Sequence, residues 1–276
     1  NNKKTNLKPE ELIVLDQRSK YLRRLVVEAL AGGKRGHIGS SFSLIEILRV
    51  LYDDILKVRP KDPKWPERDR CILSKGHGCL ALYALLVDKG FFPDTELAKF
   101  CRPGAMLGGH PEFPKIPGVE FSTGALGHGL SVGIGMAISA RIQKRGSRVF
   151  VIMGDGEINE GSVWEAALSA GKHGLENLII LIDCNKMQSY GSTDCVLSLD
   201  PIADKWQSFG FSVIEVNGHC IGDLRNALKK LPLETKKPTA VICHTVKGKG
   251  VPFLEGKPEW HHKSNISVDV IQSLNH

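Results

Sequence analysis

The sequence predicts an α/β domain whose parallel β-sheet carries helices on both faces. Two short apolar runs, residues 149–153 and 178–182, are rich in β-branched residues, as is typical of parallel strands buried on both sides. A helical pattern over residues 162–168 lies between them, so the three segments form a strand–helix–strand unit. The carboxyl ends of such strands meet at one edge of the sheet, where open α/β sheets bind their ligands.

The other elements follow from periodicity and from helix-capping and turn residues. Residues 1–8 are polar and predict a loose N-terminal arm, and residues 9–276 predict one domain. Residues 91–121 lack periodicity, and their proline and aromatic content predicts an ordered active-site loop. Helices are expected over residues 9–31, 44–52 (with Ser43 as N-cap), 80–89, 130–144, 200–209, 221–231 and 268–274. Further strands are expected over residues 70–73, 212–216 and 239–244.

The composition is that of a globular protein, with 42% hydrophobic and 24% charged residues. The net charge of +7 is spread along the chain without a zinc-finger or RNA-binding motif, so we expect no nucleic-acid partner. The seven cysteines show no C-x-x-C spacing, which predicts free thiols in a reducing cytoplasm. We expect neither a signal peptide nor a membrane span, because no apolar run approaches ~20 residues.

Polar residues follow both apolar runs of the central unit. Asp155 lies between Gly154 and Gly156, and Asn185 follows the second run. Carboxylate and amide oxygens are hard ligands that suit Mg²⁺ or Ca²⁺. The two glycines would let a diphosphate approach backbone N–H groups at the start of a helix. An acidic turn is the alternative, but the spacing from Gly156 to Asn185 resembles the thiamine diphosphate motif.

Three histidines lie in glycine-rich loops, where a ligand could reach their rings. They are His37, His77 and His110. A solvated loop histidine is the alternative, but the repetition of the pattern favours a site. The basic glycine loop at residues 245–250 is either an ordinary turn or a lip over a phosphate.

Six motifs together resemble the amino-terminal, diphosphate-binding domain of transketolase, in the family's order and over residues 10–265. They are GHIGSSFS, SKGHG, GGHPE, STGALGHGLSVGIGMA, GDGEINEG with Asn185, and KGKGV with a downstream Trp-His pair. The resemblance implies a thiamine diphosphate-binding fold and a ketol transferase of carbohydrate metabolism. It would move a two-carbon unit from a ketose phosphate to an aldose.

The resemblance also implies roles for individual residues. The metal, expected to be Mg²⁺, would be bound by the side chains of Asp155 and Asn185 and by the backbone carbonyl of Met187. Residues implied in cofactor binding are His77, Gly124, Leu126, Gly154, Asp155, Gly156, Asn185 and His261. Catalytic roles are implied for the histidines around the donor sugar and for two carboxylates facing a partner subunit: His37, His77, His110, His261, Glu160 and Glu165.

Three departures from full-length enzymes resemble split transketolases. Lys75, Ala125 and His128 stand where Asn, Pro and Gln are common in the family. A full transketolase is more than twice as long as this sequence, and the glutamate that contacts the cofactor's aminopyrimidine belongs to the domain that is lacking here. We therefore expect an α₂β₂ heterotetramer with a separate C-terminal, pyrimidine-domain subunit. Alternatively, Glu160 and Glu165 only form a favourable acidic first turn of a solvated helix.

Two other functions stay open at this point. One is another thiamine enzyme subunit, either deoxyxylulose-phosphate-synthase-like or the alpha subunit of a 2-oxo acid dehydrogenase; His37 and the His110-Pro111-Glu112 motif favour transketolase instead. The other is a non-catalytic regulatory protein, against which the retained metal ligands and histidines argue. The sugars, the partner chain and the pathway, pentose phosphate or specialised, do not follow from the sequence.

Overall fold

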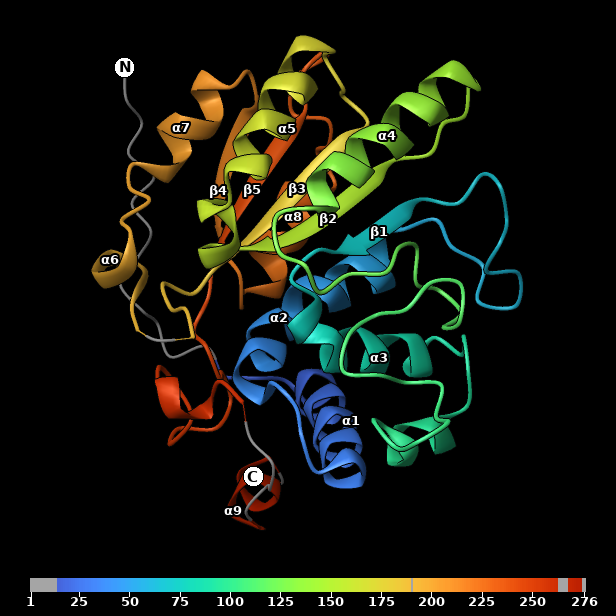
Figure 1. The fold of residues 1–276 in the computed structure, drawn as a ribbon, viewed down its shortest axis with the longest axis vertical. Coiled ribbons are helices and arrows are strands. Elements are labelled where there is room, and N and C mark those ends of the chain that lie inside the picture. The colour runs from blue at the N-terminus through green and yellow to red at the C-terminus, as the bar shows by residue number, and fades with distance from the viewer. Residues whose placement is uncertain (1–13, 190, 263–267, 275–276) are drawn as a thin grey trace.

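Five parallel strands form the sheet of the computed structural model, which describes residues 14–189, 191–262 and 268–274 (Figure 1). Their order across the sheet is β1–β2–β3–β5–β4, and every neighbouring pair is parallel. The strands are β1 (Arg70–Leu73), β2 (Val149–Gly154), β3 (Leu178–Cys184), β4 (Ser212–Asn217) and β5 (Thr239–His244). Each predicted strand is present, and the predicted fold class is confirmed.

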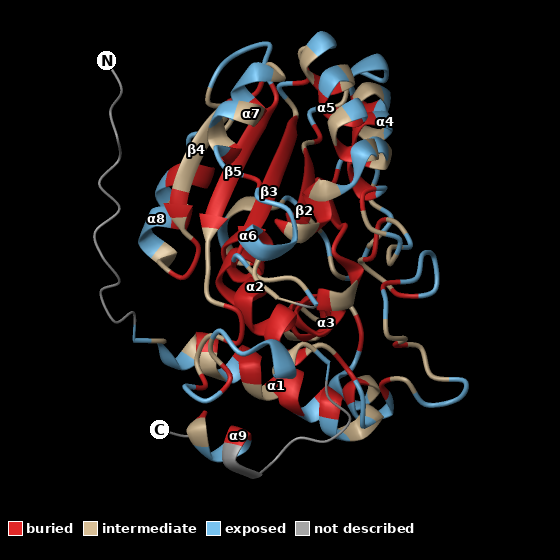
Figure 2. Cartoon of the chain, turned by 60° about the vertical axis from the view of Figure 1, so that its left-hand side comes forward, coloured by how far each residue is buried: buried red, intermediate tan, exposed pale blue. Residues whose placement is uncertain are grey.

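The central strands are buried on both faces, and Figure 2 shows β2, β3 and β5 as the buried middle of the molecule. Alternate residues of a strand point to opposite faces, so β2 contributes Phe150 and Ile152 to one apolar cluster and Val149, Val151 and Met153 to the other. The first cluster joins the sheet to α1 (Gln17–Gly33), α2 (Ile38–Val50), α3 (Cys79–Asp88) and α8 (Ile221–Leu228). The second joins it to α4 (Gly129–Ile142), α5 (Gly161–Lys172) and α7 (Ile202–Ser208).

The second predicted helix, 44–52 with Ser43 as its cap, is wrong at its start. Helix α2 begins at Ile38, His37 is its N-cap residue, and a π-helical turn extends it over Leu51–Ile55. Ser43 is buried inside the helix, where its hydroxyl donates to Asp183 at 2.6 Å. The residue looked like a cap in the sequence because its distant hydrogen-bond partner is visible only in three dimensions.

The first helix also differs from its predicted bounds. Helix α1 begins after Asp16, whose carboxylate accepts a hydrogen bond from the Ser19 N–H, and it continues to Gly33. Lys34 ends it in the left-handed conformation with φ 51°, so the helix runs two residues past its predicted end at residue 31. The predicted arm at residues 1–8 lies outside the described residues.

The remaining helices are short, and the irregular segment is largely as expected. They are α6 (Thr193–Val196), α9 (Val268–Ser273) and the 3₁₀ turns Gly76–Gly78, Asp94–Lys99, Gly156–Asn159 and Pro258–Trp260. Apart from Asp94–Lys99, the segment 91–121 is irregular. Among the described residues, none of the helices has the length and apolar character that a membrane crossing requires.

Candidate functional site

A small pocket of about 80 Å³ lies where the carboxyl ends of β1, β2, β3 and β5 meet, and we call it the edge pocket. Its lining residues come from segments far apart in the chain: Ser40, Lys75, His77, Leu126, Gly154, Asp155, Gly156, Glu157, Asn185, Met187, Gln188, Ser189, Lys247 and His261. Every residue that the sequence implied for cofactor or metal binding is in this set except Gly124. The structure therefore brings the two polar strand ends together as predicted.

The strand register explains why Asp155 and Asn185 meet. Gly154 of β2 pairs with Asp183 of β3, so both chains leave the sheet at the same level. The two carboxylate oxygens of Asp155 accept from the N–H groups of Gly156 and Lys186, and the amide oxygen of Asn185 accepts from the Met187 N–H at 3.0 Å. These bonds orient both side chains. Burial, and then the neighbouring carboxylate of Asp183, raises the pKa of Asp155 to about 6.

A buried ion pair forms the floor of the edge pocket. Lys75 Nζ lies 2.6 Å from Asp183 Oδ2, and the two side chains are 2% and 0% exposed. Asp183 also accepts hydrogen bonds from the hydroxyls of Ser43 and Thr245. Burial alone would raise the pKa of Asp183, but Lys75 and these donors hold it below its usual value. A buried pair of this kind is stable only when its remaining hydrogen-bonding groups are satisfied, as they are here for the carboxylate.

A second ammonium reaches the pocket from the basic glycine loop. Lys247 Nζ donates to the Gln188 carbonyl at 3.3 Å and to His261 Nδ1 at 2.9 Å. Burial, and then the charge of Lys75, lowers the pKa of Lys247 to about 8. Burial, followed by Lys247, lowers the pKa of His261 to about 4. Two lysines in one pocket favour an anionic ligand. The loop at 245–250 therefore contributes a cation to the edge pocket through Lys247, and its role as a lip over a phosphate stays a prediction.

Three buried residues hold this loop on both sides of Lys247, and we call them the loop triad: Arg23, Glu46 and His219. Arg23 lies 2.6 and 3.0 Å from the two carboxylate oxygens of Glu46, and His219 Nδ1 lies 2.8 Å from that carboxylate. His219 Nε2 accepts from the Val246 N–H at 2.8 Å, and Arg23 Nε donates to the Lys249 carbonyl at 2.8 Å. Because Nε2 is an acceptor, the proton of the neutral ring is on Nδ1 and is donated to Glu46.

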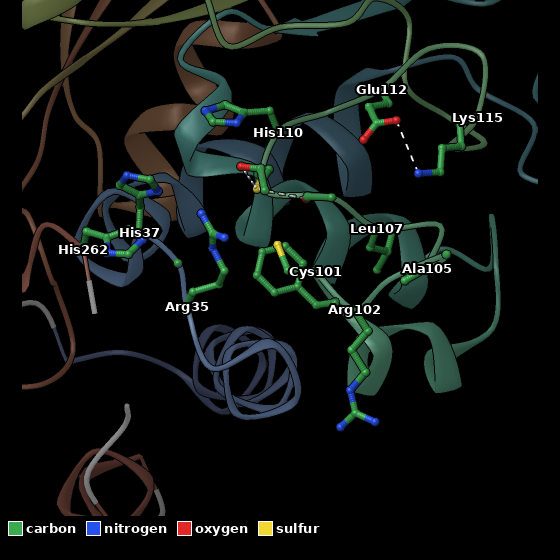
Figure 3. A pocket seen from close by; sticks show the side chains of 16 residues that line it. Arg35, His37, Cys101, Arg102, Ala105, Leu107, His110, Glu112, Lys115 and His262 are labelled. Carbon is green, nitrogen blue, oxygen red and sulfur yellow. Dashed lines mark hydrogen bonds and ion pairs between the residues drawn. The ribbon is translucent and has the colours of Figure 1, made fainter. Parts of the chain in front are cut away.

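A larger cavity of about 580 Å³, which we call the open cavity, adjoins the histidines. Figure 3 shows His37, His110 and His262 on one side of it and Lys115 on the other. The ring of His37 is 5.4 Å from that of His77, 5.1 Å from that of His261 and 4.8 Å from that of His262, between centroids. Since His77 and His261 line the edge pocket and His37 lines the open cavity, the histidines lie between the two spaces.

Burial favours the neutral form of four histidines: His37, His77, His110 and His261. Burial, and then neighbouring histidines, lowers the pKa of His37 to about 3; burial also lowers the pKa of His77 and of His110. A neutral imidazole can both donate a hydrogen bond and take up a proton. Gly124 leaves room here, because a Cβ at this position would be 3.1 Å from the His110 ring. The four predicted histidines thus share one region, and Gly124 borders it rather than the edge pocket.

Glu160 and Glu165 line neither space. Both are exposed, at the N-cap and within α5, beside the 61% exposed Leu168. Their role towards a partner subunit therefore stays a prediction. The buried carboxylate of this motif is Glu157, which accepts from Ser74 Oγ and from the N–H groups of Gly127 and Gly154 and so ties three loops together.

Sequence reasoning missed several residues of the site: Glu157, Asp183, Gln188, His262 and the loop triad. Lys75 was noted only as a departure from the family, and Lys247 only as part of a basic loop. His262 could have been found because it adjoins His261. The loop triad carries no local signal, since its members are dispersed over 23–219.

The fold and the edge pocket define a cofactor-binding α/β domain, and comparison with known proteins specifies the family. The model of the family described as "Transketolase, thiamine diphosphate binding domain" matches residues 15–275. The chain belongs to this family.

Similar proteins include subunits of two-chain transketolases. The chain is 43% identical to an apulose-4-phosphate transketolase subunit of Phocaeicola vulgatus, over 90% of this chain and 88% of that protein. It is 40% identical to 6-deoxy-6-sulfo-D-fructose transketolase subunit SqwG of a Clostridium species, over 92% of each. The structure of a Pichia stipitis transketolase variant matches 94% of this chain with TM-score 0.88 and 33% identity. The chain covers 40% of that longer protein.

Proposed function

We propose that this chain is the amino-terminal subunit of a transketolase that works with a separate C-terminal subunit, as an α₂β₂ heterotetramer. The enzyme transfers a two-carbon ketol unit from a ketose phosphate to an aldose, with thiamine diphosphate and Mg²⁺. The observation that carries this proposal is the edge pocket, in which a hard-oxygen pair lies beside two lysines and two histidines. The subunit relatives, matched over about nine tenths of their length, support the two-chain arrangement.

The donor set of the edge pocket fits a diphosphate with a divalent cation. Asp155, Asn185 and the Met187 carbonyl would hold the metal, which we expect to be Mg²⁺; Ca²⁺ takes ligands of the same type. Lys75, Lys247 and backbone N–H groups would hold the phosphates. Gln188 Nε2 supports this assignment, because it is a buried donor with no partner among the described residues and it lines the pocket.

The cofactor, when bound, supplies the carbanion chemistry. The histidines of this chain orient the sugar and hold or move protons at its hydroxyl and carbonyl oxygens. His37 and His110 face the open cavity and act on the substrate, whereas His77 and His261 also border the edge pocket. Their depressed pKa values keep them neutral, which is the form able to accept a substrate proton.

The sugar substrate carries a terminal anion. The two subunit relatives are named for apulose 4-phosphate, which has a phosphate, and for 6-deoxy-6-sulfo-D-fructose, which has a sulfonate. We infer the same substrate class here, whether the pathway is the pentose phosphate route or a specialised one. All seven cysteines are free in the structure, which supports a reducing, cytoplasmic location.

Reconstitution tests the proposal. The purified chain, its C-terminal partner and their mixture are each assayed for ketol transfer over a sugar-phosphate panel, with saturating thiamine diphosphate and Mg²⁺. We expect turnover only in the mixture, and sedimentation of the mixture as a heterotetramer. Robust turnover by the isolated chain would refute the two-chain assignment, and decarboxylation of 2-oxo acids without ketol transfer would replace transketolase by a related thiamine enzyme.

A further inference from the structure

The open cavity contains more positive than negative charge. Its charged lining residues are three cations, Arg35, Arg102 and Lys115, and one carboxylate, Glu112. Lys115 Nζ lies 3.3 Å from Glu112, so that pair is locally compensated. Within the described part of the chain, the Arg102 side chain makes one long hydrogen bond, 3.4 Å, to the Gly32 carbonyl. Because the carboxylate in this lining, Glu112, is already paired with Lys115, the charges of Arg35 and Arg102 are not compensated within the lining.

Arg35 is the cation best placed for a ligand inside the cavity. Figure 3 shows its side chain between His37 and Cys101, whereas the side chain of Arg102 points away from the histidines. Among the described residues, none forms a hydrogen bond or ion pair with the Arg35 guanidinium. The charge of Arg35 nevertheless acts on other groups of the cavity. Burial, and then Arg35, lowers the pKa of His110. Burial raises the pKa of Cys101, and the charge of Arg35 opposes that rise.

The backbone directs Arg35 and His37 into the same space. They flank Gly36, whose φ of 156° lies at the edge of the region that favours glycine and where a Cβ would be 2.5 Å from Leu30. Residues two apart in an extended segment project to the same side, so the Arg35 guanidinium and the His37 imidazole line the same cavity. An anion bound by Arg35 would thus leave the rest of the sugar facing His37 and His110.

We propose that Arg35 binds the terminal anionic group, a phosphate or a sulfonate, of the sugar substrate, so that this subunit itself contributes to charge recognition. The inference rests on the proposed function and deepens it. A guanidinium offers parallel N–H donors that match two oxygens of such an anion, which a lysine does not. Lys75 and Lys247 do not compete for this role, because they line the edge pocket and not the open cavity.

The test compares Arg35→Gln with wild type and with Lys34→Gln in the assembled two-chain enzyme. Lys34 is the matched control, since it is an exposed neighbouring cation that does not line the cavity. Acceptors are ribose 5-phosphate and ribose, and donors are fructose 6-phosphate, 6-deoxy-6-sulfofructose and fructose. We expect Arg35→Gln to raise KM for the anionic sugars about tenfold or more, with kcat and the kinetics of neutral sugars close to wild type. Lys34→Gln should change neither.

The choice of substrates distinguishes failure of the Arg35 inference from failure of the proposed function. A larger KM effect with the phosphorylated than with the sulfonated donor identifies phosphate as the group that Arg35 binds, and the reverse identifies sulfonate. Equal effects of Arg35→Gln on charged and neutral sugars, or no effect, would overturn the inference. No ketol transfer by the wild-type pair would instead overturn the proposed function. In that event calorimetry of fructose 6-phosphate binding to cofactor-saturated wild type and Arg35→Gln still decides the inference, since equal affinities would contradict it.

Discussion

The edge pocket and the open cavity lie on either side of the histidines, but their charges are arranged differently. In the edge pocket, Lys75 is paired with Asp183 and Lys247 bonds to Gln188 and His261, each within a narrow buried space. In the open cavity, the side chains of Arg35 and His37 have no hydrogen-bond partner among the described residues. The difference indicates that the first space is organised in advance for a ligand that stays bound. The second leaves its polar groups unpaired, which suits the proposed binding of a substrate that enters and leaves.

The free energies of paired and unpaired buried groups agree with this difference between the two spaces. Removing one partner of a buried ion pair costs about 3–5 kcal/mol, so the floor of the edge pocket is fixed at folding. Asp155 is the exception within that pocket, because it is 3% exposed and, among the described residues, no cation lies close enough to form an ion pair with it. A divalent cation would supply that charge. The open cavity gains little stability from its unpaired groups and can be altered without loss of the fold.

The largest effect on cofactor binding is expected from Asp155→Ala, a substitution that changes the edge pocket but not the open cavity. The variant removes a carboxylate that we propose as a metal ligand, so we expect loss of Mg²⁺-dependent thiamine diphosphate binding with an intact fold. Calorimetry measures the affinity, and circular dichroism monitors the fold. Asp204→Ala, an exposed carboxylate on α7, is the control. Unchanged cofactor affinity in folded Asp155→Ala would eliminate the metal assignment.

The next effect tests the open cavity. His37→Ala and, separately, His110→Ala should each lower kcat by about 10²–10⁴, the usual scale for a positioned acid–base group. Cofactor affinity should stay close to wild type, because neither residue lines the edge pocket. Steady-state kinetics of the assembled enzyme and cofactor titration provide the two readouts. A wild-type rate in either variant would remove that histidine from the mechanism.

A smaller effect is expected from the loop triad, which tests whether the edge pocket depends on being held in advance. His219→Ala leaves the Val246 N–H without its partner and leaves Glu46 with Arg23 alone. It should weaken cofactor binding about 10–100-fold, as is usual for residues that orient a site indirectly. His244→Ala is the matched control, since the His244 ring also contacts a glutamate, Glu215, but that contact does not hold the loop at 245–250. Equal affinities of the two variants would show that the triad does not position Lys247.

The smallest expected effect is a pH dependence of stability. The pKa of His37 is depressed to about 3 in the fold from an unfolded value near 6.5, so its neutral form stabilises the protein above pH 6.5 and this contribution is lost as pH falls. The unfolding free energy should therefore fall about 1.4 kcal/mol more per pH unit in wild type than in His37→Asn below pH 6.5. The charged or titratable groups around His37 are His77, His110, Lys247, His261 and His262.

Urea unfolding at pH 7.5 and 5.5 measures this slope. His128→Asn, at an exposed histidine, provides the control and should keep the wild-type slope. Parallel pH dependences of wild type and His37→Asn would mean that His37 is not kept neutral by the fold.

The sequence by itself determined the strands, the two polar strand ends and three of the histidine loops. These features are local: unbroken apolar runs, glycines beside a functional residue and the spacing of Asp155 and Asn185 are all visible along one dimension. The family motifs carried the remaining assignments, including His261. The same locality explains the error at Ser43, where a cap-like residue is a buried donor to Asp183.

Only the tertiary structure decided which charges are paired and which are free. Lys75 and Asp183 are separated by 108 positions, and His219 and Glu46 by 173, yet each pair lies within hydrogen-bonding distance. No local pattern distinguishes these residues from solvated ones of the same type. The free energy of a charge depends on its burial and on its partners, and both are set by the folded structure rather than by the local order of residues in the sequence. For the same reason, only the structure sets Arg35 apart from the other arginines of the chain.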